Sequence, residues 1–182
     1  MTGIGAKVVA IHRSLEAGQI PHAFGGALAL AFCTLRPRGT SDIDLNVFAD
    51  PSRRDAVLRN LPAPIDPTQE QSDLLARDGQ ARLFWDETPV DLFLDTTTFH
   101  EEAMLRVQWQ DFAGESLPFL GCSDLAVFKA FFDRTKDWAD LEEMIAAGSL
   151  DRARVLGVLV TYLGGSDPRV ERLRTLGPPS HR

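Results

Sequence analysis

Residues 22–48 read HAFGGALALAFCTLRPRGTSDIDLNVF, and this stretch decides the predicted fold. A short apolar strand at 20–24 leads into Gly25 and Gly26, which permit backbone geometry that a Cβ would hinder. Small apolar residues then predict a short helix over 27–35 that can lie close to a sheet. A glycine pair between a strand and a helix is often only a tight turn. It can also hold a phosphate on the free N–H groups at the start of the helix.

The second strand of this stretch, predicted over 42–48, separates two kinds of side chain. Aliphatic residues alternate with Asp42, Asp44 and Asn46, so that the acidic face is predicted to look outward. Two like charges about 7 Å apart along a strand repel each other, and Asp is a poor strand former. A solvated edge strand is one interpretation. A divalent cation held between the carboxylates is the other, since it removes the repulsion.

The rest of the chain predicts a sheet followed by helices. A helix is expected over 6–16, and a β-hairpin over 80–94 has its turn at 86–89. Further helices are predicted at 51–60, 98–107, 123–134 with Ser123 as N-cap, 137–147, 151–163 and 167–176, with a short strand at 117–120 and a frayed tail at 177–182. We therefore predict an α/β (α+β) protein, with a region at 1–115 that carries a mixed sheet flanked by helices and a helical region at 116–182.

Composition limits the class of protein. The chain has 182 residues, with 44% hydrophobic and 25% charged, which is ordinary for a globular domain. No apolar run approaches the roughly 18 residues that span a bilayer, and the amphipathic N-terminal segment is unlike a signal peptide, so we expect a cytoplasmic protein. A net charge of −7 is unlike a non-specific nucleic-acid binder, although a local basic patch and bound cations still attract phosphates. Cys33 and Cys122, which lack a CxxC motif, are expected to be buried free thiols.

A third carboxylate comes from later in the chain. Asp91 lies among apolar residues in the second arm of the predicted hairpin, where on its own it is an exposed strand residue. If that hairpin lies beside the strand with Asp42 and Asp44, the three carboxylates suit two Mg²⁺ ions about 4 Å apart, the arrangement for in-line phosphoryl displacement. Asp91 would then also accept the proton of the incoming hydroxyl.

Basic residues in the C-terminal region are candidates for holding phosphates. Lys129 falls near the buried edge of the helix predicted over 123–134. One interpretation is a lysine whose stem is buried and whose head is solvated; the other is a point charge that binds the leaving phosphates. Arg134 or Lys136 would add to this, Asp140 would orient one of them, and Arg38 lies directly before the acidic strand.

Taken together, these residues resemble a known superfamily. Gly25-Gly26, then Arg38-x-Thr40-x-Asp42-Ile43-Asp44-Leu45, then an isolated Asp91 resemble the nucleotidyltransferases related to DNA polymerase β. The later pattern Lys129-x4-Arg134-x-Lys136-Asp137-x2-Asp140 resembles the AbiEii family, the nucleotidyltransferase toxins of type IV toxin–antitoxin systems. The compact length is most similar to the MenT toxins of mycobacteria. The resemblance covers roughly residues 20–145.

The resemblance implies a fold, an activity and a set of site residues. The fold is the nucleotidyltransferase fold, and the activity is transfer of a nucleoside monophosphate, CMP from CTP being favoured, to the 3′ end of tRNA with release of pyrophosphate. Asp42, Asp44 and Asp91 would bind two Mg²⁺ ions and act in catalysis with Lys129. The nucleotide would contact Gly25, Gly26, Arg38, Thr40, Lys129, Arg134, Lys136 and Asp140. A cognate antitoxin protein, in some systems a kinase, would phosphorylate Thr40 or Ser41 beside the aspartates.

Two other interpretations stay open. Small nucleotidyltransferases that modify aminoglycosides or lincosamides share a glycine pair and a DxD motif, and others modify proteins; the antibiotic enzymes have no match for the pattern around Lys129 to Asp140. A nucleotide-binding or antitoxin module without turnover belongs to another class, and the presence of all three carboxylates argues against it. The chain has no GxSxG, HExxH or P-loop motif, which disfavours hydrolases and ATPases of those types.

Overall fold

A computed structural model describes residues 3–178 of the chain, which forms two compact units. Within the described residues, the first unit consists of 3–28 and 39–120, and the second of 29–38 and 121–178. The predicted boundary at 115/116 divides the chain once and assigns residues 29–38 to the region with the sheet. The structure groups residues 29–38 with the later helices. Residues 179–182 of the expected frayed tail lie outside the described residues.

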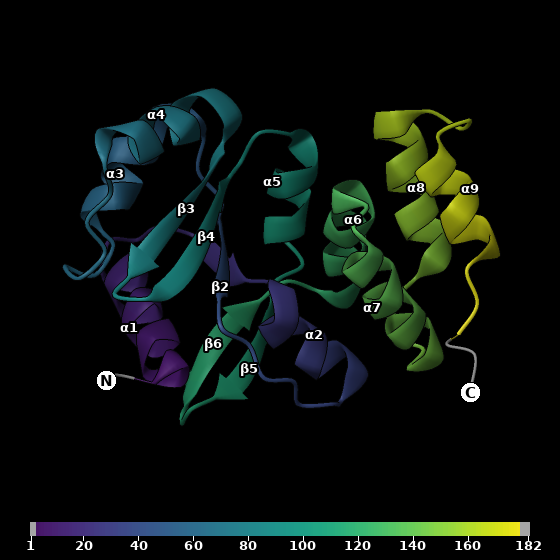
Figure 1. Cartoon of the computed structure of the whole chain (residues 1–182), viewed down its shortest axis with the longest axis horizontal. Coiled ribbons are helices and arrows are strands. Elements are labelled where there is room, and N and C mark those ends of the chain that lie inside the picture. Colours follow the sequence, from purple (N-terminus) through teal and green to yellow (C-terminus); the bar gives the residue numbers. More distant parts are fainter. Residues whose placement is uncertain (1–2, 179–182) are drawn as a thin grey trace. The chain divides into compact units, whose positions relative to one another are not determined.

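A six-stranded mixed sheet forms the centre of the first unit (Figure 1). The strands, in the order β3-β4-β2-β1-β6-β5, are β1 (His22–Phe24), β2 (Ile43–Val47), β3 (Gln80–Trp85), β4 (Thr88–Leu94), β5 (Gln108–Phe112) and β6 (Glu115–Phe119). β1 runs antiparallel to β2 and parallel to β6, and β2 runs parallel to β4. Antiparallel hairpins, β3–β4 and β5–β6, complete the two edges. The predicted α/β class with a mixed sheet is confirmed.

Helices of the first unit connect strands of this sheet, and two of them contact it. α1 (Ile4–Ala17) contacts β6, and α4 (Gln69–Asp78) contacts β3. The remaining helices of this unit are η1 (Pro51–Arg53), α3 (Arg54–Arg59) and α5 (Thr98–Met104). α4 begins with a capping box, in which the Thr68 hydroxyl accepts the N–H of Gln71 and the Gln71 side chain accepts the N–H of Thr68. That box holds a largely polar helix in place.

The aliphatic face of β2 forms part of the buried core, as its alternating pattern predicted. Ile43 and Leu45 are fully buried, as are Val90 and Leu92 on the neighbouring strand β4. Burying one such side chain stabilises a fold by about 1.5–3 kcal/mol. A one-residue slip of β2 would turn this face to solvent, so its burial fixes which way the aspartates point.

The β3–β4 hairpin closes with a shorter turn than predicted. Trp85 pairs directly with Thr88, which leaves Asp86 and Glu87 as a two-residue turn in place of the expected turn at 86–89. Asp86 has φ of +51°, the left-handed conformation that two-residue hairpin turns require. The turn length sets the register of the whole hairpin, and this decides which side chains meet across it.

The second unit is helical and contains the later part of α2 (Gly26–Thr34). Its other helices are α6 (Cys122–Phe132), α7 (Thr135–Ala146), α8 (Arg152–Leu163) and α9 (Pro168–Thr175). α6 contacts α7, α8 and α9, and α8 lies beside α9 (Figure 1). Trp138, Leu141 and Met144 of α7 are buried in its core, together with Val155 and Leu159 of α8. Across the described residues, every helix is too short or too polar to span a membrane.

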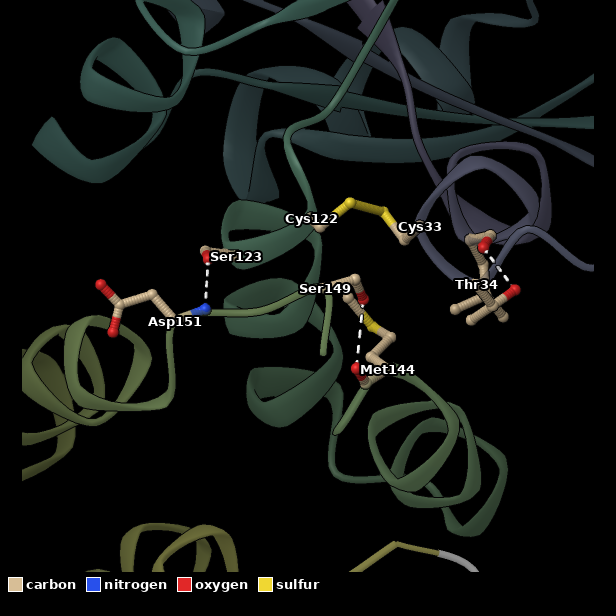
Figure 2. The surroundings of a disulfide bond; sticks show 8 residues. Cys33, Thr34, Cys122, Ser123, Met144, Ser149 and Asp151 are labelled. Carbon is tan, nitrogen blue, oxygen red and sulfur yellow. Dashed lines mark hydrogen bonds between the residues drawn. A yellow bond between two sulfur atoms is a disulfide. The ribbon is translucent and has the colours of Figure 1, made fainter. Parts of the chain in front are cut away.

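Cys33 and Cys122 form a disulfide bond within the second unit (Figure 2). Their Cα atoms are 5.6 Å apart, so the expectation of two free thiols was wrong. The two cysteines are 89 residues apart in sequence, and only the packing of α2 beside the start of α6 brings them together. Ser123, predicted as the N-cap of α6, instead accepts a hydrogen bond from the Asp151 N–H at 2.9 Å, and Gly121 is the N-cap.

Candidate active site

The three predicted aspartates lie on, or directly before, the neighbouring strands β2 and β4 of the first unit. Asp44 and Asp91 are directly paired residues of these two parallel strands, and Asp42 lies one residue before β2. Paired residues on neighbouring strands point to the same face, with their strands about 4.8 Å apart. All three aspartates are half-buried. The hairpin therefore lies beside the acidic strand, the condition on which the cluster depended.

The glycine turn before α2 lies directly against Asp44. The Gly25 N–H donates to the Asp44 backbone carbonyl at 2.9 Å. Gly26 has φ of +54°, and a Cβ on it would stand 1.7 Å from Asp44 Oδ2. A Cβ on Gly25 would stand 2.9 Å from Nδ2 of Asn46. Asn46 was predicted on the outward face of the strand, but its side chain is buried. Both glycines are thus needed for this close approach, which places the start of α2 at the aspartates.

Thr40 holds the Asp42 carboxylate in one orientation. Its hydroxyl donates to Asp42 Oδ1 at 2.7 Å. Thr40 is half-buried, whereas the next residue, Ser41, is exposed. A hydroxyl bound to a carboxylate fixes the direction of its lone pairs, so Thr40 positions Asp42 and Ser41 faces solvent.

Arg82 belongs to this site, and the sequence analysis missed it. It lies directly opposite Asp91 across the β3–β4 hairpin, and it donates from Nε to Oδ1 and from Nη2 to Oδ2, both at 2.7 Å. The Asp91 carboxylate, helped by Asp42 and Asp44, raises the pKa of the Arg82 guanidinium above its ordinary value. If the hairpin had been predicted with a two-residue turn and not a four-residue one, the predicted register would have placed Arg82 opposite Asp91.

The carboxylates are of the chemical type that binds magnesium, but the three side chains are not gathered around one point. Asp42 and Asp44 supply half-buried carboxylate oxygens, the donors that Mg²⁺ prefers. Asp91 is the least suited of the three to bind a metal in this arrangement, because the Arg82 guanidinium contacts both of its oxygens and its positive charge opposes that of a cation. Within residues 3–178, no three His, Cys, Asp or Glu side chains are gathered closely enough to form a metal site. The two ions expected from three carboxylates therefore stay a prediction.

Lys129 is buried in an ion-pair network of the second unit. Its Nζ donates to Asp140 Oδ2 at 2.6 Å and lies 3.7 Å from Asp137 Oδ1. Lys129 is 6% exposed, so its ammonium group is not the solvated head of the first interpretation. Two carboxylates on α7 fix the position of this charge.

Asp140 also binds Arg38, a second residue predicted to contact the nucleotide. Arg38 Nη1 donates to Asp140 Oδ1 at 2.5 Å, and Nη2 donates to Glu143 Oε1 at 3.1 Å. The hydrogen bond to Asp140 raises the pKa of the Arg38 guanidinium. Asp140 therefore links Lys129 on α6 with Arg38, one carboxylate oxygen to each cation.

The other two basic candidates lie near the start of α7. Arg134 donates from Nε to Asp137 Oδ2 at 2.6 Å, and its guanidinium carbon lies 4.8 Å from the centre of the Phe132 ring. Lys136 is exposed. Arg134 thus helps to hold the buried Asp137 carboxylate, and Lys136 faces solvent.

The predicted site residues therefore fall into two sets, each gathered within its own unit. The carboxylate set belongs to the first unit and comprises Gly25, Gly26, Thr40, Ser41, Asp42, Asp44 and Asp91, to which the structure adds Arg82. The lysine set belongs to the second unit and comprises Arg38, Lys129, Arg134, Lys136 and Asp140.

Comparison with known proteins gives a likeness in structure alone. No family model matches the chain, and no curated protein sequence matches it. The solution structure of the antibiotic-resistance factor ANT(2″)-Ia matches with a TM-score of 0.54 and 13% sequence identity, over 93% of this chain and 88% of that one. The crystal structure of ANT(2″)-Ia in complex with adenylyl-2″-tobramycin matches with a TM-score of 0.52 and 14% identity, over 95% of each chain.

The chain has a nucleotidyltransferase fold. An antigenic nucleotidyltransferase-like protein from Paracoccidioides brasiliensis is also similar, with a TM-score of 0.46 and 14% identity over 97% of this chain and 94% of that chain. At these identities the likeness concerns the fold. In this fold the carboxylate set lies at the turn that leads into α2, on β2 and directly before it, on β4 and, for Arg82, on β3.

Proposed function

We propose that this chain is a nucleotidyltransferase, which moves a nucleoside monophosphate from a nucleoside triphosphate to a hydroxyl acceptor and releases pyrophosphate. The observation that carries the proposal is the pairing of Asp44 with Asp91 on parallel strands, beneath a glycine turn that admits no Cβ beside Asp44. A sheet gains no stability from like charges at directly paired positions. A divalent cation that binds a triphosphate beside these carboxylates would account for the arrangement, with Arg82 supplying the opposite charge to Asp91 in its absence.

The carboxylate set supplies the proposed reacting centre. Asp42 and Asp44 would hold Mg²⁺, which when bound would neutralise the triphosphate and the charge on the leaving pyrophosphate. Backbone N–H groups at the start of α2, after Gly25, would bind phosphate oxygens. Thr40 keeps Asp42 oriented through its hydroxyl. Asp91 would accept the proton of the acceptor hydroxyl.

The lysine set supplies proposed phosphate ligands. Lys129 and Arg38 share Asp140, which keeps both cations in fixed positions and lowers the entropy lost when they bind an anion. Arg134 and Lys136 would add positive charge at the start of α7. Charge-assisted bonds to phosphate are about twice as strong as neutral hydrogen bonds.

A tRNA 3′ end is the first candidate acceptor. The pattern from Lys129 to Asp140 supports it, because that spacing resembles the AbiEii and MenT toxins. On this proposal CTP donates CMP, and the blocked tRNA end stops translation. A cognate antitoxin would then accompany the protein in the cytoplasm.

A small hydroxylated antibiotic is the second candidate acceptor. The likeness to ANT(2″)-Ia supports it, since one of the matching structures holds adenylyl-2″-tobramycin and the match covers 95% of each chain. On this proposal the product is an aminoglycoside carrying a nucleotidyl group.

Thr40 is the proposed regulatory residue of the carboxylate set. Its hydroxyl already touches the Asp42 carboxylate, so a phosphate on Thr40 would replace a hydrogen-bond donor with about two negative charges. Repulsion would turn Asp42 away and exclude a triphosphate. A phosphate on the exposed Ser41 would act from a greater distance.

The proposal is tested with the four nucleoside triphosphates, each labelled at its α-phosphate, in the presence of Mg²⁺. Each is incubated with a tRNA pool and, separately, with a set of aminoglycosides, and label on the acceptor is measured. We expect transfer to one acceptor class by the wild type, loss of at least about a hundredfold in Asp44→Asn, and no change in Asp55→Asn, an exposed aspartate of α3. Equal transfer by the wild type and Asp44→Asn would contradict the assignment.

A further inference from the structure

Asp91 already has a cation bound to both of its oxygens. Arg82 faces it across the β3–β4 hairpin and makes two parallel contacts of 2.7 Å. The Arg82 side chain is 54% exposed and that of Asp91 is 20% exposed. The guanidinium thus reaches the carboxylate from the solvent side, from an edge strand of the sheet.

The same guanidinium lies in the field of the other two aspartates. Asp44 pairs directly with Asp91 on the opposite side from Arg82, and Asp42 and Asp44 both favour the charged form of Arg82. Arg82 is therefore the counter-cation of Asp91, and it adds positive charge near the other two carboxylates, as a divalent cation would. The guanidinium takes up one lone pair on each Asp91 oxygen, and its positive charge repels a metal ion at the same carboxylate.

We propose that Arg82 competes with a divalent cation for Asp91, so that Asp91 joins Asp42 and Asp44 as a metal ligand only when the cation displaces the guanidinium. The inference rests on the proposed function in taking Asp42 and Asp44 as metal ligands. The exchange breaks two N–H···O bonds to Asp91 and forms a metal–carboxylate bond, with no change in covalent structure. The long, half-exposed Arg82 side chain then turns to solvent or to a phosphate of the nucleotide.

A purely structural role for the ion pair makes a different prediction. Opposite charges at paired positions stabilise a hairpin, typically by about 0.2–1 kcal/mol. In that case, removal of Arg82 would weaken the fold and leave metal affinity unchanged or lower. The proposal requires the affinity for metal to rise.

The test measures Mn²⁺ binding, from the paramagnetic resonance signal of free Mn²⁺, in the full chain without nucleotide. We expect Arg82→Gln to bind Mn²⁺ about tenfold more tightly than the wild type, because a competing and repelling charge is gone. Asp91→Asn in the Arg82→Gln background should cancel the gain. The matched control is Arg77→Gln, since Arg77 makes a comparable exposed pair with Asp78, and it should change affinity less than twofold.

Arg82→Lys provides a second variant if Arg82→Gln fails to fold, because a lysine keeps the charge and loses the two-point contact. Its Mn²⁺ affinity should lie between those of the wild type and Arg82→Gln. Unchanged or weaker binding in both Arg82 variants, or no Mn²⁺ binding in any variant, would overturn the proposal.

The outcome is separable from that of the proposed function. Nucleotide transfer by the wild type with no effect of Arg82 on metal binding would refute the competition and leave the function intact. A rise in Mn²⁺ affinity in Arg82→Gln, in a protein that transfers no nucleotide, would support the competition and refute the function.

Discussion

Gly26 and Asp44 approach so closely that a Cβ on Gly26 would stand 1.7 Å from Asp44 Oδ2, and Gly26 also has φ of +54°. We expect Gly26→Ala to lower the free energy of unfolding by about 1–3 kcal/mol, since alanine is strained at positive φ and its methyl group would displace the carboxylate. Nucleotide transfer should fall with it. Urea denaturation and the transfer assay measure the two effects.

Gly157→Ala is the control for this prediction. Gly157 lies within α8, and nothing stands within 4 Å of an added Cβ. Alanine there should stabilise the protein by about 0.5–1 kcal/mol. A Gly26→Ala protein as stable and active as the wild type would show that the close approach to Asp44 does not matter.

Asp140 joins two cations, so its removal should destabilise the second unit. Asp140→Ala leaves the buried Lys129 ammonium with Asp137 at 3.7 Å as its nearest carboxylate, and we expect a loss of about 3 kcal/mol in the free energy of unfolding. Adding Lys129→Met should recover most of that loss, because no buried ammonium is then left behind. Lys136→Ala, at an exposed position of the same helix, should change stability by less than about 0.5 kcal/mol. Additive losses in the double variant would argue against a coupled pair.

The Cys33–Cys122 disulfide should make stability depend on redox conditions. It closes a loop of 89 residues, and constraint of the unfolded chain by such a loop contributes about 4 kcal/mol. The double Cys33→Ser/Cys122→Ser variant should unfold at a lower temperature than the wild type, and a reductant should bring the wild type to the same value. If reductant leaves the unfolding temperature of the wild type unchanged, the bond does not constrain the chain.

His100 should make the fold less stable in mild acid. Burial lowers the pKa of His100 from 6.5 to about 4. Below pH 6.5 His100 is protonated in the unfolded chain but stays neutral in the folded chain. The contribution of His100 to the free energy of unfolding therefore falls as the pH drops from 6.5 to about 4, and it is constant below that range. By pH 5 the loss is about 2 kcal/mol.

Urea denaturation at pH 7 and pH 5 measures this loss, with His100→Gln for comparison. The variant should lose about 2 kcal/mol less than the wild type over that interval. Burial also lowers the pKa of His22, so the stability of the variant should still fall in part as the pH drops. Burial raises the pKa of Asp95, which lies 3.9 Å from His100, and this opposes the loss of stability near pH 4. Identical slopes in the two proteins would show that His100 titrates normally.

The features that the sequence predicted are local ones. The alternation of residues along β2 predicted that Asp42 and Asp44 lie on the face opposite the aliphatic one, and the glycine pair predicted the turn. Both signals depend on only a few neighbouring residues. The mixed sheet followed from the same patterns. α4 was missed because its sequence is mostly polar, although Thr68 and Gln71 have the spacing of a capping box.

The features that the sequence did not predict depend on register or on distant segments. A turn two residues shorter than expected moved Arg82 opposite Asp91, since every pair in a hairpin follows from the turn. The disulfide joins cysteines 89 residues apart, and Arg38 meets Asp140 from a position 102 residues away. Such contacts arise from packing, for which a single sequence has no local signal.

The central claim is that the carboxylate set transfers nucleotides, and the release of pyrophosphate measured together with label on the acceptor tests it most directly. The wild type should release one pyrophosphate for each nucleotidyl group transferred. Asp44→Asn and Asp91→Asn should each lose both signals by at least about a hundredfold, while Asp55→Asn keeps them. Undiminished transfer in the Asp44 and Asp91 variants, or no transfer by the folded wild type to any acceptor, would contradict the account.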